Sequence, residues 1–267
     1  FWYPFLHGLL AQEEDVLIPP PEEPAEQEEQ QAPPLTAEEI LAQYTDSDIP
    51  EDRKIDLLVF QREAYADFSV FDVEGMDWSC YDLYHALQAE SYTGTLITNT
   101  FSGGTIDTER CFLTGLYKVG DLPEEGNLNS YVWYLKNQGY TVEGCHPCYE
   151  WFYDRKTVNT RLGFDRYRFS EDTFTALSGD VVAYDKILMP VVWDMYQEKT
   201  ADGTPYFGYH VTYQGHGPYT TTWVQWPGAH FSEGALEGEN CNIFNNCHSL
   251  CFFLSSWSSF LNLCRSF

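Results

Sequence analysis

Lysine and arginine are absent from the first 52 residues and scarce afterwards, so the 267-residue chain has 14 of them against 41 aspartates and glutamates. The formal net charge is −27. A protein that binds the phosphate backbone of a nucleic acid needs a basic patch to replace the counterions, and this sequence has none. Nucleic acid is therefore not an expected partner.

The stretch 11–52 is rich in proline and glutamate and holds 14 of the acidic residues. It cannot bury enough apolar surface to offset the entropy of ordering, which predicts a solvated, extended linker. Residues 1–10, FWYPFLHGLL, are apolar and aromatic but fall short of the roughly 20 apolar residues that cross a bilayer. They fit either the remnant of a membrane segment in a region missing before Phe1 or a disordered apolar tip.

Aspartate is absent after residue 202, and the last 27 residues contain no acidic side chain. Half of the eight cysteines gather there, as Cys241, Cys247, Cys251 and Cys264. This abrupt change in composition predicts that residues 233–267 are an atypical, non-native tail. A disulfide knot or a Cys/His metal site is the alternative, although the C-x5-C-x3-C spacing is not a recognised pair of ligand hooks.

Residues 53–232 alternate between apolar runs and amphipathic segments, which predicts one α/β domain. Strands are expected at 54–60, 92–100 and 141–146 and from 205 into a loop, and helices at 78–89, 105–117, 128–140, 152–161 and 180–197. Strands that alternate with helices indicate a mostly parallel sheet sandwiched by helices. In such sheets, binding sites form beyond the carboxyl ends of the strands.

Polar side chains follow four of these strands, namely Glu63, Thr105, His146 and His216. Because parallel strands end at the same edge of a sheet, a carboxylate, a hydroxyl and two imidazoles are expected to converge there. This convergence is more informative than any one of the four residues.

Thr105 follows two glycines, Gly103 and Gly104, at the start of a predicted helix. The first N–H groups of a helix attract a tetrahedral oxyanion, and glycine lets the backbone approach a ligand closely. The residue is either a nucleophile that needs a base or a metal to activate it, or simply the N-cap, a role that Asp107 or Thr108 could also fill. Glu63 is a candidate ligand for a hard divalent cation, or an ordinary loop glutamate.

Five segments, in order, resemble the lipoteichoic-acid-synthase-like sulfatases, which are extracellular phosphoglycerol transferases of the alkaline phosphatase superfamily. They are LLVFQREAYADFSVF, FSGGTIDTERCFLTG, LNSYVWYLKNQGYTVEGCHP, FYDRKTVNTRLGFD and HVTYQGHGPY. The similarity covers roughly residues 54–220. It implies a sulfatase-like fold that is C-terminally incomplete in this chain.

The resemblance also implies roles for individual residues. Thr105 matches the family's nucleophile, and with Glu63 it would bind a divalent metal, usually manganese, with magnesium as the alternative. Substrate would be bound by Gly104, His146, Tyr153, Arg155 and His216, with Tyr153 standing where tryptophan is more usual and Gly215 where asparagine is usual. Arg155 would grip phosphate through two parallel hydrogen bonds.

The implied reaction is ping-pong transfer from a phosphatidylglycerol-type donor, through a phosphoglyceryl-threonine, to a glycerol-phosphate polymer or to water. The domain would lie outside the cell membrane and act in cell-envelope polymer synthesis. The family draws its other metal ligands from a later Asp-His pair, which does not occur after His216. The alternative is therefore an inactive or truncated member that binds envelope phosphates.

Two rival functions remain open at this point. CHPC at residues 145–148 is a C-x-x-C motif that fits a thiol redox protein. A sulfatase or phosphodiesterase with another ester substrate is also compatible with the pattern. Typical sulfatases modify a cysteine or serine in a C/S-x-P-x-R motif, and its absence at the nucleophile position favours phosphoryl transfer.

Overall fold

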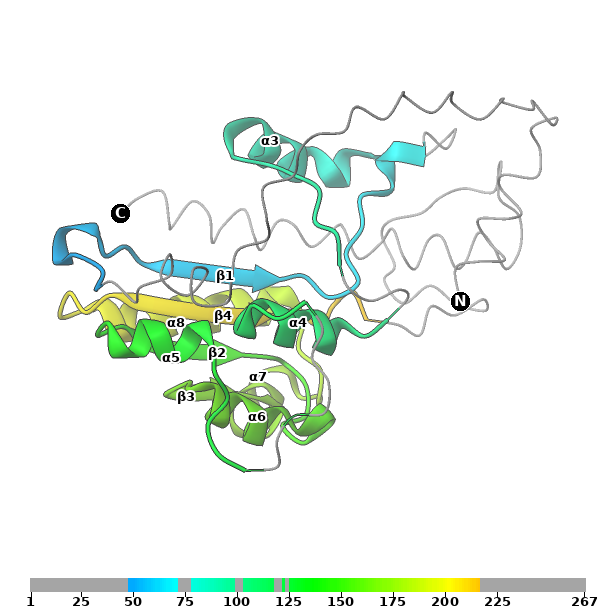
Figure 1. Cartoon of the computed structure of the whole chain (residues 1–267). Helices are drawn as coiled ribbons and strands as arrows, with labels where there is room; N and C mark the ends of the chain where they lie inside the picture. Colours follow the sequence, from blue (N-terminus) through cyan, green and yellow to red (C-terminus); the bar gives the residue numbers. More distant parts are fainter. Residues whose placement is uncertain (1–47, 72–77, 99–102, 118–121, 123–124, 217–267) are drawn as a thin grey trace, which may run out of the picture. The chain divides into compact units, whose positions relative to one another are not determined.

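The computed structural model describes residues 48–71, 78–98, 103–117, 122 and 125–216 (Figure 1). The chain divides into two units, Phe1–Arg53 and Lys54–Phe267. In the first unit the described residues form a 3-10 turn at Glu51–Arg53. The apolar start at 1–10, nearly all of the acidic stretch and the cysteine-rich tail lie outside the described residues. None of the helices found in the described ranges is both long and apolar enough to cross a bilayer.

The second unit is built on a parallel sheet in which the strand order is β1-β4-β2-β3. The strands are β1 (Leu57–Gln61), β2 (Thr141–Cys145), β3 (Arg166–Arg168) and β4 (Tyr206–Val211). All six residues of β4 are buried, as expected for a parallel strand covered on both faces. The strand predicted at 92–100 is wrong for residues 92–98, which have no regular structure, and the remaining residues, 99 and 100, are not described.

Six α-helices surround the sheet in the part of the chain that the structure describes. They are α3 (Asp82–Glu90), α4 (Thr105–Thr114), α5 (Tyr131–Asn137), α6 (Arg155–Leu162), α7 (Thr175–Ser178) and α8 (Asp185–Thr200). Short 3-10 turns lie at Phe68–Phe71, Trp78–Tyr81 and Phe152–Asp154, and a π turn at Ser170–Phe174. The helix predicted at 105–117 ends at Thr114. Gly115 takes a left-handed conformation there, and its N–H donates to the backbone carbonyl of Cys111.

Helices cover both faces of the sheet. The long helix α8 packs its apolar side on one face, where Leu188, Met189 and Val192 meet Cys145 of β2. Helices α4 and α5 lie over the other face, where Phe112 stacks on Tyr209 of β4 at 5.5 Å between ring centroids (Figure 1). The predicted α/β class, a mostly parallel sheet between helices, is thereby confirmed.

Candidate active site at the carboxyl edge of the sheet

The loops that follow β1 and β4 are joined at the edge where the site forms. The N–H of Thr212 donates to the carbonyl of Gln61 at 3.0 Å, and the N–H of Glu63 donates to Oγ1 of Thr212 at 3.0 Å. A Cβ added at Gly215 would overlap the carbonyl oxygen of Glu63, so glycine permits this approach. The contacts hold Glu63, which is 8% exposed, beside the loop that carries His216.

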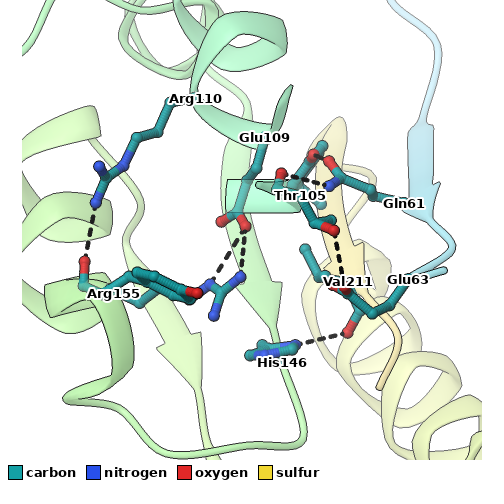
Figure 2. Close-up of polar contacts among 10 residues, drawn as sticks. Gln61, Glu63, Thr105, Glu109, Arg110, His146, Arg155 and Val211 are labelled. Carbon is teal, nitrogen blue, oxygen red and sulfur yellow. Dashed lines mark hydrogen bonds and ion pairs between the residues drawn. The ribbon is translucent and has the colours of Figure 1, made fainter. Parts of the chain in front are cut away.

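Thr105 is the first residue of α4, and its side chain points to the carboxylate of Glu63. Its Oγ1 donates to Oε1 of Glu63 at 2.7 Å, while Nε2 of Gln61 donates to the backbone carbonyl of Thr105 at 3.1 Å (Figure 2). The N-cap of α4 is Gly104, in a left-handed conformation with φ of 76°, and no side chain caps the helix. The N-cap alternative for Thr105 is therefore wrong, and its hydroxyl donates to Glu63 instead.

A pocket of about 140 Å³ lies in front of this hydrogen bond. The structure brings all seven residues named from the sequence into its lining, namely Glu63, Gly104, Thr105, His146, Tyr153, Arg155 and His216. The lining also includes Gly103, which precedes Thr105 in the paired glycines, and three residues that the sequence did not indicate, namely Ile106, Phe152 and Tyr213. A carboxylate, a hydroxyl, a guanidinium and two imidazoles thus share one small cavity.

His146 is 1% exposed, and its Nδ1 lies 3.1 Å from the backbone carbonyl of Val211 (Figure 2). A carbonyl only accepts, so Nδ1 must be the nitrogen that carries the hydrogen. Burial, together with the positive charge of Arg155, lowers the pKa of His146 well below its usual value, against the opposing effect of the Val211 bond. The ring is neutral, which leaves Nε2 as a hydrogen-bond acceptor.

Arg155 forms a buried ion pair with Glu109 of α4. Oε2 of Glu109 accepts from Nε of Arg155 at 3.2 Å and from Nη2 at 3.0 Å, and the side chains are 1% and 3% exposed respectively (Figure 2). Burial raises the pKa of Glu109, and the facing guanidinium opposes that shift. Burial also works against the charge of Arg155, but Glu109 raises its pKa above the usual value, so the guanidinium stays charged.

The turn that carries Tyr153 is held by the same helix. Nη2 of Arg110 donates to the backbone carbonyl of Tyr153 at 2.9 Å. Tyr153 and Asp154 both have positive φ values, 58° and 54°, a conformation that costs energy for residues other than glycine. Glu109 and Arg110 were missed from the sequence, where the available signal was the four-residue spacing that puts Glu109 on the same helix face as Thr105.

Tyr213 lies between the two histidines of the pocket. Its ring stacks on His216 at 4.7 Å between centroids and 8° between planes, and it contacts His146 at 5.7 Å. Burial raises the pKa of Tyr213 to about 12, so the phenol is neutral. The sequence signal was its place three residues before His216, where its carbonyl accepts from the His216 N–H at 2.9 Å.

Glu63 and Thr105 supply two neighbouring oxygen atoms, the ligand type that hard divalent cations prefer. Within the described ranges, no cluster of three or more histidine, cysteine, aspartate or glutamate side chains is arranged to hold a metal. The two oxygen atoms fit part of the coordination shell of a divalent cation.

The two cysteines of the CHPC segment face the interior. Cys145 packs in the core against α8, with Sγ 3.1 Å from Nδ1 of His210, and Cys148 is also buried. Burial raises the pKa of both thiols, which disfavours the thiolate that redox chemistry needs. The thiol redox interpretation is wrong for this site.

Comparison with known proteins identifies the family to which the chain belongs. A family model described as Sulfatase matches residues 71–240, a stretch that includes Thr105, Arg155 and His216 and begins after Glu63. A protein of Rhizobium meliloti (strain 1021) whose name assigns it to cyclic beta-1,2-glucan modification is 28% identical over 134 residues, which are 47% of this chain and 20% of that protein.

Solved structures share the fold at low sequence identity. The Streptococcus pyogenes phosphoglycerol transferase GacH, in complex with sn-glycerol-1-phosphate, matches 81% of this chain and 59% of its own with a TM-score of 0.57 and 18% identity. The lipoteichoic acid synthase LtaP from Listeria monocytogenes gives 0.56 and 14% over 79% of this chain and 52% of its own. An alkaline phosphatase superfamily protein from Vibrio parahaemolyticus gives 0.55 and 17% over 77% and 51%.

This chain thus spans a fifth of the curated relative and little more than half of each solved structure. The family match covers more than half of the present chain, and all three solved structures share its fold at TM-scores of 0.55 to 0.57. The chain belongs to the sulfatase family and has the fold of the alkaline phosphatase superfamily.

Proposed function

We propose that the protein is a phosphoglycerol transferase, or a hydrolase of the same phosphate esters, that uses Thr105 as its nucleophile. The observation that carries this proposal is the 2.7 Å hydrogen bond from Thr105 to Glu63 at the mouth of the pocket that Arg155 lines. The same cavity is lined by this polarised hydroxyl, by the N-terminus of a ten-residue helix and by a guanidinium. That combination suits a tetrahedral phosphate ester.

In the proposed reaction, Oγ1 of Thr105 attacks the phosphorus of a phosphatidylglycerol-type donor and the P–O bond to diacylglycerol breaks. The proton that the Thr105 hydroxyl gives up ends on the departing oxygen, so diacylglycerol leaves as a neutral alcohol. Glu63 accepts the hydrogen bond of the hydroxyl and so orients its lone pair toward the pocket. Glu63 and Thr105 would hold a divalent cation, Mn²⁺ or Mg²⁺, which when bound lowers the pKa of a coordinated hydroxyl and offsets phosphate charge. A glycerol hydroxyl of a growing polymer, or water, then displaces the threonine.

The remaining pocket residues divide the recognition of the donor. Arg155 and His216 would bind the phosphoryl oxygens, and the Nε2 acceptor of neutral His146 would take a hydrogen bond from a glycerol hydroxyl. Tyr153 would cover the head group with its ring. The sn-glycerol-1-phosphate bound by the S. pyogenes transferase supports this class of substrate.

The proposal extends to the setting of the reaction. An anionic lipid or a glycerol-phosphate polymer would be the partner, and the domain would work outside the cell membrane in envelope synthesis. The names of two similar proteins, a lipoteichoic acid synthase and a cyclic glucan modification protein, support an envelope polymer as the acceptor.

A second candidate function is a binding module that retains the pocket but does not turn over. It is favoured by one observation: Glu63 and Thr105 give two oxygen ligands, and no cluster of three acidic, histidine or cysteine side chains is found among the residues described. Such a protein would bind phosphoglycerol groups without breaking their esters.

The test compares wild type with Thr105→Ala on a phosphatidylglycerol analogue with a fluorescent head group, in the presence of Mn²⁺. We expect the variant to lose at least on the order of 10³-fold in rate, because its nucleophile is gone. Thr108→Ala, one turn along the same helix, is the matched control and should keep wild-type activity. Intact-mass spectrometry should detect a phosphoglyceryl adduct on wild type that the Thr105→Ala variant lacks.

Equal turnover by wild type and Thr105→Ala would overturn the nucleophile assignment. Wild-type protein that binds glycerol phosphate but shows neither turnover nor adduct would favour the binding module. The experiment therefore separates the two candidate functions.

A further inference from the structure

The ion pair behind the pocket uses one particular edge of the Arg155 guanidinium. Nε and Nη2 both donate to Oε2 of Glu109, so the side edge of the guanidinium is occupied (Figure 2). A guanidinium has five N–H donors in a fixed plane. One hydrogen on Nη1 and the second one on Nη2 form the end edge, which makes no contact with Glu109.

Helix α4 positions both the proposed nucleophile and this guanidinium. Glu109 follows Thr105 by four residues, so the two side chains lie on the same face of the helix, one turn apart. Arg110, next along the helix, holds the backbone of Tyr153, two residues before Arg155. The orientation of Arg155 relative to Thr105 is therefore fixed by one rigid element.

Glu109 also balances the charge of Arg155 from behind. Both side chains are almost completely buried. Charges are weakly screened in the protein interior, so the two groups interact strongly. On the pocket side, Glu63 adds a carboxylate and His146 is neutral. An anion at Arg155 is thus held by directed N–H donors more than by excess positive charge, and a second negative charge on the ligand gains little there.

We propose that Glu109 is a positioning and specificity-determining residue, which presents the end edge of Arg155 to the substrate and makes the pocket prefer singly charged phosphodiesters to doubly charged phosphomonoesters. This inference rests on the proposed function and deepens it. It explains how a transferase would accept a phosphodiester donor while binding weakly to glycerol phosphate and inorganic phosphate, which carry about two charges above pH 7.

The test measures binding, by calorimetry on the full chain with Mn²⁺ at pH 8. The probes are glycerophosphoglycerol, a diester, and sn-glycerol 1-phosphate, a monoester. Glu109→Gln keeps an oxygen acceptor for Arg155 and removes the charge. It should bind the monoester about tenfold more tightly than wild type, through the uncompensated guanidinium, and bind the diester within about threefold of wild type.

Matched controls address folding and charge in general. Glu198→Gln removes the carboxylate that lies 3.7 Å from Nη2 of Arg168. Glu198 is on α8 and outside the pocket lining, so this variant should leave both affinities unchanged. Glu109→Asp keeps the charge with a shorter side chain. It should weaken both ligands and retain the wild-type ratio, and this variant decides the matter if Glu109→Gln fails to fold.

A double variant shows whether Glu109 acts through Arg155. Adding Glu109→Gln to Arg155→Gln should change neither affinity further. An unchanged monoester-to-diester ratio in Glu109→Gln, or a changed ratio in Glu109→Asp, would overturn this inference and leave the proposed function standing. Wild-type protein that binds neither probe, or binding indifferent to Arg155→Gln, would contradict the proposed function as well.

Discussion

The imidazole of His146 donates through Nδ1 to Val211 and is held neutral by burial beside Arg155. A neutral imidazole brings no positive charge to a bound phosphate. Its Nε2 can accept a hydrogen bond from a hydroxyl instead. The sequence shows only that a histidine is present. The hydrogen-bond partner of one ring nitrogen decides whether the other nitrogen can donate or accept.

Replacing His146 with asparagine isolates this role. The asparagine amide can still donate to Val211 at the position of Nδ1, but nothing replaces the Nε2 acceptor. We expect glycerol phosphate to bind about tenfold more weakly, as for the loss of one hydrogen bond, while inorganic phosphate binds as before. Calorimetry with both ligands checks this, and a parallel loss of phosphate affinity would show that His146 binds the phosphoryl group after all.

The residues that could be predicted from the sequence share a simple origin. Glu63, Thr105, His146 and His216 follow apolar runs or paired glycines, and such local patterns mark the edge of a parallel sheet. Glu109 could not be found in this way, because its partner Arg155 is 46 residues away and the contact depends on how α4 packs against α6. In the sequence, a charged residue that is buried in an ion pair cannot be told apart from one on the surface.

Among the secondary-structure elements, the helices and buried strands follow their apolar periodicity, and the exposed segment does not. Residues 92–98 have the threonine and isoleucine content of a strand, yet Leu96 and Ile97 are exposed and no neighbouring strand pairs with them in the described residues. Strand propensity depends on a pleated, half-buried setting, which a local sequence cannot report. Helix α8 begins at Asp185, five residues later than predicted, because residues 180–184 carry no clear signal in the sequence for the start of the helix.

The packing of the loop after β4 on the end of β1 leads to an element-level prediction. Gly215→Ala should displace the backbone of Glu63, since the new Cβ would overlap its carbonyl oxygen. We expect the fold to be retained while turnover and Mn²⁺ affinity fall by about tenfold, because a misplacement of about 1 Å at a reacting group costs at least that much. Rate assays and metal titration check the outcome.

Gly94→Ala is the matched control for this substitution. Nothing lies within 4 Å of a Cβ at Gly94, and its φ is not in the left-handed region, so the variant should resemble wild type. A Gly215→Ala protein with wild-type turnover would show that the approach of the two loops is not needed for the position of Glu63.

At the scale of the whole molecule, two neutral histidines lie in the interior of the sheet region. Burial lowers the pKa of His210 to about 3 and that of His146 well below its usual value. Because the folded state binds fewer protons than the unfolded state, the stability these groups contribute is fully present above about pH 6.5 and is lost as the pH falls toward 3. Glu143, whose pKa burial raises, acts in the opposite direction.

The contribution of His210 can be measured as a difference between proteins. Between pH 7.5 and 5.5 it should cost wild type on the order of 1 kcal/mol of unfolding free energy, a large share of typical domain stability. His210→Gln does not titrate in this range, so its stability should fall less over the same interval, whatever the stability of the variant at pH 7.5. Phe60→Leu, which alters the ring packed on His210 at 5.2 Å, should instead lower stability equally at both pH values. Urea unfolding at the two pH values distinguishes these outcomes, and equal pH dependence in wild type and His210→Gln would mean that the buried imidazole is not what makes this fold sensitive to acid.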